Sequence, residues 1–104
     1  MWVLHVKATV KPGSEAQYEK WKITEGEEQR KAPGFIHRRM VRSRDRQGIY
    51  FYQSAWDTKE QAHEFMDSDH FKELYARLRP ADTFEVPMER DECDLIFDEY
   101  AVKG

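Results

Sequence analysis

Apolar side chains alternate with other side chains through the first ten residues. The apolar set that shares one face of the extended chain comprises Trp2, Leu4, Val6, Ala8 and Val10. A period of two is typical of a strand with one buried face, so residues 2–10 are predicted to form a strand. His5 and Lys7 fall on its opposite face and are expected to meet a partner subunit.

A helix is predicted to follow at residues 15–31. The segment KPGSEAQ contains a Pro-Gly turn, and Ser14 with Gln17 matches a capping box. The main apolar residues of this helix are Tyr18, Trp21 and Ile23. They are few, and Gly26 interrupts the helix, so weak packing on the sheet is expected.

Two further strands are predicted in the middle of the chain. The segment APGF at residues 32–35 ends the helix, and a strand follows to about residue 43. After a turn at RDRQG, the segment IYFYQSAW at residues 49–56 is rich in aromatic side chains that favour extended structure. This segment is predicted to be the third strand.

The region from residue 57 to residue 79 carries two apolar stripes. One comprises Ala62, Phe65 and Met66, and the other comprises Phe71, Leu74, Tyr75 and Leu78. At about 100° per residue the stripes fall on opposite sides of one straight helix, which therefore cannot bury both. Ser68 or Asp69 can cap a fresh helix, so two helices are predicted, the second ending before Pro80.

The C-terminal region is predicted to add one more strand. Residues 81–94 are polar and irregular, with a possible short edge element at Phe84, Val86 and Met88, and LIFDEYAV at residues 95–102 is predicted to be the final strand. The resulting order, β, α, β, β, α, α, β, describes an α+β sandwich with helices on one sheet face. Residues 1–104 are expected to form a single domain.

The predicted strands place apolar residues on both faces of the sheet. In the third strand the two sets are Tyr50, Tyr52 and Trp56, and Ile49, Phe51 and Ala55. Helices cover only one face, so the other face is predicted to meet a second copy of the chain in a homodimer.

Composition narrows the classes of function. The chain has 104 residues, a formal net charge of −3 and no global basic bias, so nucleic acid is not an expected partner. No apolar run reaches the roughly 18 residues that span a membrane, and a cytoplasmic location is expected. The single cysteine, Cys93, excludes an internal disulfide and a cysteine-based zinc cage, and no metal site is predicted.

Three segments together resemble the antibiotic biosynthesis monooxygenase family, in the dimeric α+β barrel superfamily. They are VKPG at residues 10–13, APGF at residues 32–35 and SAWDTKEQAHEFMDSDHF at residues 54–71. The resemblance covers most of residues 2–79. It implies a ferredoxin-like sandwich with an antiparallel sheet that pairs as a dimeric α/β barrel, with a pocket between sheet and helices. It also implies oxidation of aromatic substrates, often with no flavin or metal.

The branches of the family differ at a few positions. Val6, Phe65 and Tyr75 occupy the places of the characteristic Asn, Trp and His of the heme-degrading branch, so heme degradation by that mechanism loses its main support. A tyrosine can ligate ferric heme iron, which leaves heme binding open. The quinol-oxidising branch often has histidines at the positions of Phe65 and His70, and only His70 is present here.

Candidate catalytic residues follow from this resemblance and from the pattern. His70 is the expected base, near a helix start whose dipole disfavours the imidazolium, with Tyr75 or Arg38 orienting a substrate oxygen. Alternatives stay open: His70 packs at the helix join, Tyr75 fills the core, or Arg38 pairs with the acidic segment EGEE at residues 25–28 or with the partner subunit. His63 is expected to be a solvated or ion-paired surface residue.

The expected substrate-binding residues are Trp56, Phe65, Phe71 and Val6, whose aromatic members suit a flat ligand. The leading hypothesis is a cofactor-independent monooxygenase acting on a small aromatic, quinol-like or polyketide-like substrate. One alternative is a protein that binds heme or another hydrophobic ligand without turnover. The other is a non-catalytic dimer with a structural or regulatory role.

Overall fold

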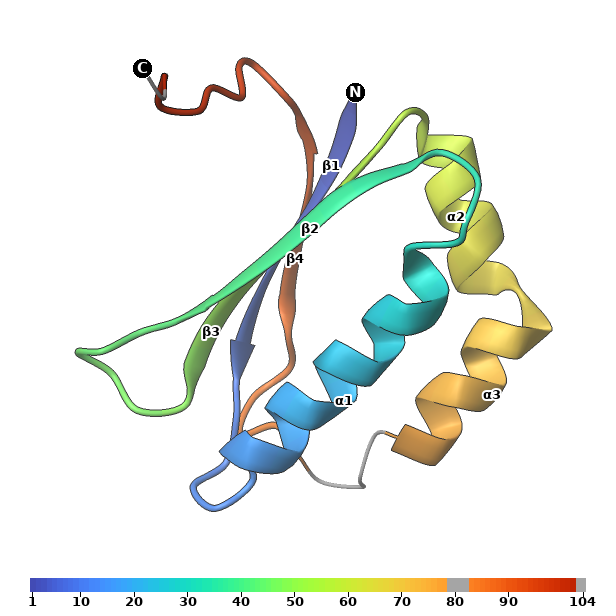
Figure 1. The fold of residues 1–104 in the computed structure, drawn as a ribbon. Coiled ribbons are helices and arrows are strands. Elements are labelled where there is room, and N and C mark those ends of the chain that lie inside the picture. The colour runs from blue at the N-terminus through green and yellow to red at the C-terminus, as the bar shows by residue number, and fades with distance from the viewer. Residues whose placement is uncertain (79–82, 103–104) are drawn as a thin grey trace.

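The computed structural model describes residues 1–78 and 83–102 and has the predicted α+β architecture. Its elements are β1 (Trp2–Thr9), α1 (Glu15–Gln29), β2 (Phe35–Arg42), β3 (Ile49–Trp56), α2 (Lys59–Asp67), α3 (Asp69–Leu78) and β4 (Glu89–Asp94). The four strands form an antiparallel sheet in the order β2-β3-β1-β4, and the three helices lie on one side of it (Figure 1). This is a ferredoxin-like sandwich, and the predicted fold class is confirmed.

The register of β1 against β3 sets which side chains face the helices. Leu4 pairs with Ser54, and Val6 pairs with Tyr52, so these four side chains share the helix-covered face. The predicted alternation in the first strand is confirmed, with Leu4, Val6, Ala8 and Val10 all buried. The predicted third strand at residues 49–56 is also confirmed.

Helix α1 departs from the sequence prediction in its cap and in its packing. Ser14 occupies the N-cap position, but its side chain makes no capping hydrogen bond, and the Gly13 N–H donates instead to Glu15 Oε1 at 2.9 Å. The expectation of weak packing was wrong. The inner face of the helix is buried although much of it is polar, and comprises Tyr18, Trp21, Lys22, Glu25, Gly26 and Gln29. Ile23 is exposed.

The predicted break between two helices is confirmed at Ser68. Helix α2 ends at Asp67 and α3 begins at Asp69. The Ser68 hydroxyl donates to the Phe65 carbonyl at 2.7 Å and accepts from the Phe71 N–H at 3.1 Å. One side chain therefore closes the first helix and caps the second, and Ala62 of the first stripe and Leu74 of the second are both buried.

The predicted C-terminal strand was wrong. Residues 95–102 form no strand, and their exposed apolar side chains include Ile96, Phe97, Tyr100 and Val102. The polar segment before them forms β4, which pairs with the open edge of β1. Backbone hydrogen bonds hold this edge strand, and charged side chains are well tolerated at a sheet edge. Of the possible edge element, Phe84 forms an isolated bridge with Val10.

Among residues 1–78 and 83–102, no helix lies on the second face of the sheet (Figure 1). On this face the His5 ring stacks on Phe51 at 6.3 Å between centroids, and Val41 is exposed. The homodimer proposed from the sequence, which would cover this face, stays a prediction. Among the described residues, no helix is long and apolar enough to cross a membrane.

Candidate active site

A cavity of about 450 Å³ lies between the sheet and the three helices. Its apolar wall includes Leu4, Val6, Trp21, Trp56, Met66, Phe71 and Tyr75, from two strands and all three helices. A cavity of this size, with aromatic walls and a few polar groups, is typical of a small-molecule site.

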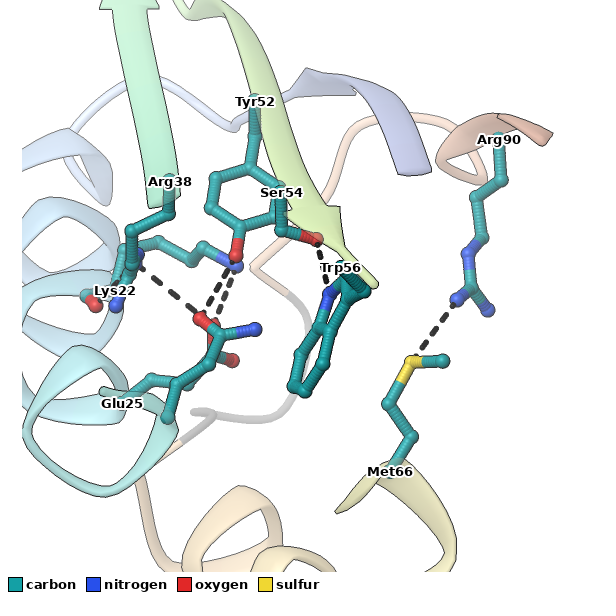
Figure 2. A network of polar contacts seen from close by, with 9 residues as sticks. Lys22, Glu25, Arg38, Tyr52, Ser54, Trp56, Met66 and Arg90 are labelled. Carbon is teal, nitrogen blue, oxygen red and sulfur yellow. Dashed lines mark hydrogen bonds and ion pairs between the residues drawn. The ribbon is translucent and has the colours of Figure 1, made fainter. Parts of the chain in front are cut away.

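Two buried charges occupy the α1 side of the cavity. Lys22 and Glu25 are only 8% and 5% exposed, and both line the cavity. Lys22 Nζ donates to Glu25 Oε1 at 2.9 Å and lies 3.7 Å from the centroid of the Tyr52 ring (Figure 2). Buried charges persist only when they are paired, and this pair is completed by a cation–π contact.

Arg38 adds a second cation behind this pair. Its Nη2 lies 3.8 Å from the same Glu25 oxygen and donates to the Lys22 carbonyl at 2.6 Å. A Cβ at Gly26 would overlap the Arg38 guanidinium, so the glycine permits the close approach. The pairing of Arg38 with the acidic helix segment is thereby confirmed, and two cations share one carboxylate.

Strand β3 supplies further polar groups at alternate positions. The Tyr52 hydroxyl donates to Gln29 Oε1 at 2.9 Å, and Trp56 Nε1 donates to Ser54 Oγ at 3.1 Å (Figure 2). Trp21 Nε1 differs, because this buried donor has no hydrogen-bond acceptor among residues 1–78 and 83–102. A buried N–H without a partner is costly to the folded state, and this atom is enclosed by the protein.

Burial shifts the pKa values of several groups at the site. Burial lowers the pKa of Lys22, against the opposing effect of the Glu25 carboxylate. Burial raises the pKa of Tyr52 to about 12, and Glu25 adds to the shift. Outside the cavity lining, burial with the hydrogen bond to Glu19 also raises the pKa of Tyr50 to about 12. The phenol groups of the protein therefore stay neutral where a ligand's phenol can ionise.

These shifts predict a loss of stability at alkaline pH. Tyr50 and Tyr52 keep their protons in the folded chain up to about pH 12, whereas they ionise near 10.0 when unfolded. The contribution of these two tyrosines to the free energy of unfolding is therefore fully present below pH 10. It falls as pH rises toward 12, by about 1.4 kcal/mol per pH unit for each tyrosine. The lowered pKa of Lys22 has the opposite effect, because it makes stability rise with pH. This effect ends at pH 10.5, the ordinary pKa of a lysine.

Urea unfolding at pH 10.5 and 11.5 measures this loss. Tyr52→Phe is expected to reduce the difference between the two pH values, because one of the contributing groups is removed. Equal stability at the two pH values in the unmodified protein would contradict the prediction.

Four of the expected site residues line the cavity together, namely Val6, Trp56, Phe71 and Tyr75. The Tyr75 ring meets Trp21 edge-on at 5.2 Å between centroids and lies 5.9 Å from Phe71. Phe65 lies behind this wall, with its ring centroid 5.7 Å from Trp56 and 5.0 Å from Phe71. It supports the wall and does not line the cavity.

The two expected polar residues His70 and Arg38 do not line the cavity. The His70 side chain is 61% exposed, with Nε2 3.2 Å from Glu28 Oε2. It borders a separate hollow of about 300 Å³ at the junction of α1 with α2 and α3. Arg38 lies behind Lys22 and Glu25 and acts on the cavity through them. The sequence prediction thus assigned the base to a residue that lies outside the main cavity.

His63 borders the cavity and is also a surface residue, as the sequence suggested. Its ring meets Trp2 edge-on at 5.9 Å, and Nε2 lies 4.0 Å from Glu92 Oε1. Its side chain is half exposed and lies at ion-pair distance from a carboxylate. This confirms the prediction that His63 is a surface residue.

Sequence reasoning missed the polar residues on α1. Lys22, Glu25 and Gln29 recur at helical spacing with Tyr18, which is the signal of a common face. The spacing could have indicated a buried polar stripe, but charged residues on a helix are ordinarily assigned to solvent.

Within the described part of the chain, no group of three or more His, Cys, Asp or Glu side chains is arranged to hold a metal ion. The fold and the cavity define a class: a ferredoxin-like α+β domain with a small-molecule site between its sheet and its helices. The profile of the antibiotic biosynthesis monooxygenase family matches residues 1–77, and the chain belongs to that family.

Solved structures share the fold at low sequence identity. SnoaB, a cofactor-independent oxygenase from Streptomyces nogalater, is 18% identical with a TM-score of 0.76, covering 93% of this chain and 95% of that chain. A conserved protein from Methanosarcina mazei is 21% identical with a TM-score of 0.77, covering 88% and 89%. A protein from Nitrosomonas europaea assigned to the same family is 18% identical with a TM-score of 0.80, covering 93% and 100%. No curated protein matches the chain in sequence.

Proposed function

We propose that this protein is a cofactor-independent monooxygenase that oxidises a small, flat phenol of the quinol-like or polyketide-like kind. One observation carries the proposal: a cavity with aromatic walls holds a buried carboxylate, Glu25, between two cations. The membership of the family supports it. SnoaB is a cofactor-independent oxygenase with the same fold, which also supports it.

Glu25 is the proposed base. Its Oε1 is held by Lys22 and Arg38, whereas Oε2 has no hydrogen-bond partner among the described residues. A carboxylate that lines the cavity with one free oxygen can accept a phenolic proton. Lys22 then faces the phenolate and stabilises its charge. His70 is not used as the base in this proposal, since it lies outside the cavity.

The substrate supplies the electrons for oxygen. The phenolate gives one electron to O₂, and superoxide then combines with the substrate radical at a ring carbon, ortho or para to the phenolic oxygen, that carries a hydrogen atom, which forms a C–O bond. Protonated Glu25 returns its proton to this peroxide. The O–O bond breaks, and hydroxide and the proton of the ring carbon leave as water. One oxygen atom enters the quinone product and the other is found in water.

Oxygen uptake with a panel of anthrones and quinols under ¹⁸O₂ tests the proposal. One labelled atom per product molecule and one O₂ consumed per product are expected, without added flavin or metal. Release of hydrogen peroxide with no label in the product would contradict a monooxygenase. So would a lack of turnover with every member of the panel. A heme titration giving a Soret band shifted by the protein, and lost in Tyr75→Phe, would favour the alternative of heme binding.

A further inference from the structure

Gln29 brings to the cavity a polar group that the proposed reaction does not use. The residue is only 5% exposed and lines the cavity from α1. Its Oε1 accepts the hydrogen bond from the Tyr52 hydroxyl at 2.9 Å. Burial raises the pKa of Tyr52 to about 12, so this hydroxyl keeps the proton that it donates. The amide oxygen of Gln29 is therefore occupied, and the amide group is held in one orientation.

The amide nitrogen of Gln29 is left for the cavity. Nε2 carries two N–H donors, and neither has an acceptor among residues 1–78 and 83–102. Trp21 Nε1 is the one enclosed and unpaired side-chain atom of the described residues, so Gln29 Nε2 keeps accessible surface. Because the side chain is otherwise buried and lines the cavity, this accessible surface faces the cavity.

The position of Gln29 on the helix relates this donor to the proposed base. Glu25 and Gln29 are four residues apart on α1, so their side chains are neighbours on one face of the helix. Both line the cavity, where the free oxygen of Glu25 accepts and the free nitrogen of Gln29 only donates. An acceptor and a donor side by side are complementary to a ligand that has a hydroxyl group and a second oxygen that accepts.

We propose that Gln29 is a specificity-determining residue, whose amide N–H binds a carbonyl oxygen of the ligand while Glu25 binds its phenolic hydroxyl. The ligand class is then a hydroxyaryl ketone, in preference to a phenol or quinol without a carbonyl group. A carbonyl oxygen is the better partner because the amide nitrogen offers only donors and a carbonyl only accepts. The inference rests on the proposed function, because it takes the cavity to be the substrate site.

Calorimetric titration with a matched pair of probes tests this without turnover. The probes are 7-hydroxy-1-tetralone and 5,6,7,8-tetrahydro-2-naphthol, which share their ring skeleton and phenolic hydroxyl and differ only in a carbonyl against a methylene group. At pH 6 both are neutral phenols, and the ketone is expected to bind about fivefold more tightly, the usual net effect of one hydrogen bond. Equal or weaker binding of the ketone would overturn the inference, as would a lack of saturable binding of both probes at millimolar concentration.

Variants separate the amide donor from general packing. Gln29→Met keeps the length of the side chain but removes the N–H donors, so the two probes should bind equally well. Tyr52→Phe removes the hydrogen bond to Oε1 but leaves the amide, so it should lose less of the preference than Gln29→Met. Gln17→Met makes the same change on the exposed face of α1 and should leave the preference unchanged. A preference that persists in Gln29→Met, or disappears in Gln17→Met, would contradict the assignment.

The two proposals can fail separately. Oxygen consumption together with equal affinity for the two probes would refute the role of Gln29 and leave the monooxygenase in place. A preference that depends on Gln29, with no oxygen consumption, would refute the monooxygenase and leave a cavity that binds hydroxyaryl ketones. Thermal unfolding of each variant checks that it is folded, and Gln29→Ala provides a readout if Gln29→Met does not fold.

Discussion

Glu25→Gln is expected to lower the rate of phenol oxidation at pH 7 by about 100-fold or more, the usual contribution of a positioned general base. Glutamine keeps the shape of the side chain but cannot accept the phenolic proton. The lost rate should return in part as pH rises, because a phenol ionised by solvent no longer needs the base. Initial rates of oxygen uptake from pH 6 to pH 10 measure both effects.

His70→Ala is the matched control for this prediction. Because His70 lies outside the cavity beside Glu28, its removal should leave the rate within about twofold of the unmodified protein. If His70→Ala lost activity while Glu25→Gln kept it, the base would be His70, as the sequence suggested.

Glu25→Gln is also expected to destabilise the protein by about 3–5 kcal/mol, because it leaves the buried Lys22 and the partly buried Arg38 without their carboxylate. Lys22→Met should cost less, since Arg38 remains to pair with Glu25. Urea unfolding of both variants gives the comparison. A smaller loss in Glu25→Gln than in Lys22→Met would contradict the shared-carboxylate arrangement.

Trp56→Ala is expected to lower the free energy of unfolding by about 3–5 kcal/mol. The side chain is 1% exposed and lies against Phe35 at 5.4 Å and Phe65 at 5.7 Å between ring centroids. Its loss would join the cavity to the space around Phe65, so binding of a flat ligand should weaken as well. Urea unfolding followed by circular dichroism gives the first value, and ligand titration gives the second.

Trp56→Phe provides a control for the two contributions of this side chain. It keeps a ring in the wall but removes the hydrogen bond to Ser54 Oγ, so a loss of about 1–2 kcal/mol is expected. If Trp56→Ala cost no more than Trp56→Phe, the ring would not be supporting the cavity wall.

The parts of the fold that were predictable have strong local signals. The third strand is rich in aromatic residues that favour extended structure, and the break at Ser68 was forced by two stripes that one helix cannot bury. The last strand was mispredicted because apolar residues 95–102 favoured a strand locally. The charged segment Glu89–Asp94 forms β4 instead, since the open edge of β1 supplies its backbone partners. Only tertiary structure contains that information.

The residues of the site were likewise predictable where a local pattern marked them and not where tertiary packing decides their position. Trp56, Phe71 and Tyr75 were found because aromatic residues on an inward stripe are good candidates for a cavity wall. His70 precedes Phe71 by one residue, which places it about 100° around α3 and outside the cavity. Lys22 and Glu25 were missed because sequence alone does not show that their helix lies against Tyr52.

The polar inner face of α1 determines what the cavity is expected to contain in the absence of a ligand. Lys22 and Glu25 need polar neighbours, so the cavity beside them is expected to hold ordered water when no ligand is present. A ligand that enters must displace this water and replace its hydrogen bonds. Affinity is then decided by how well a ligand oxygen reproduces the contacts of the water it removes, so a purely hydrocarbon molecule of the right shape should bind poorly.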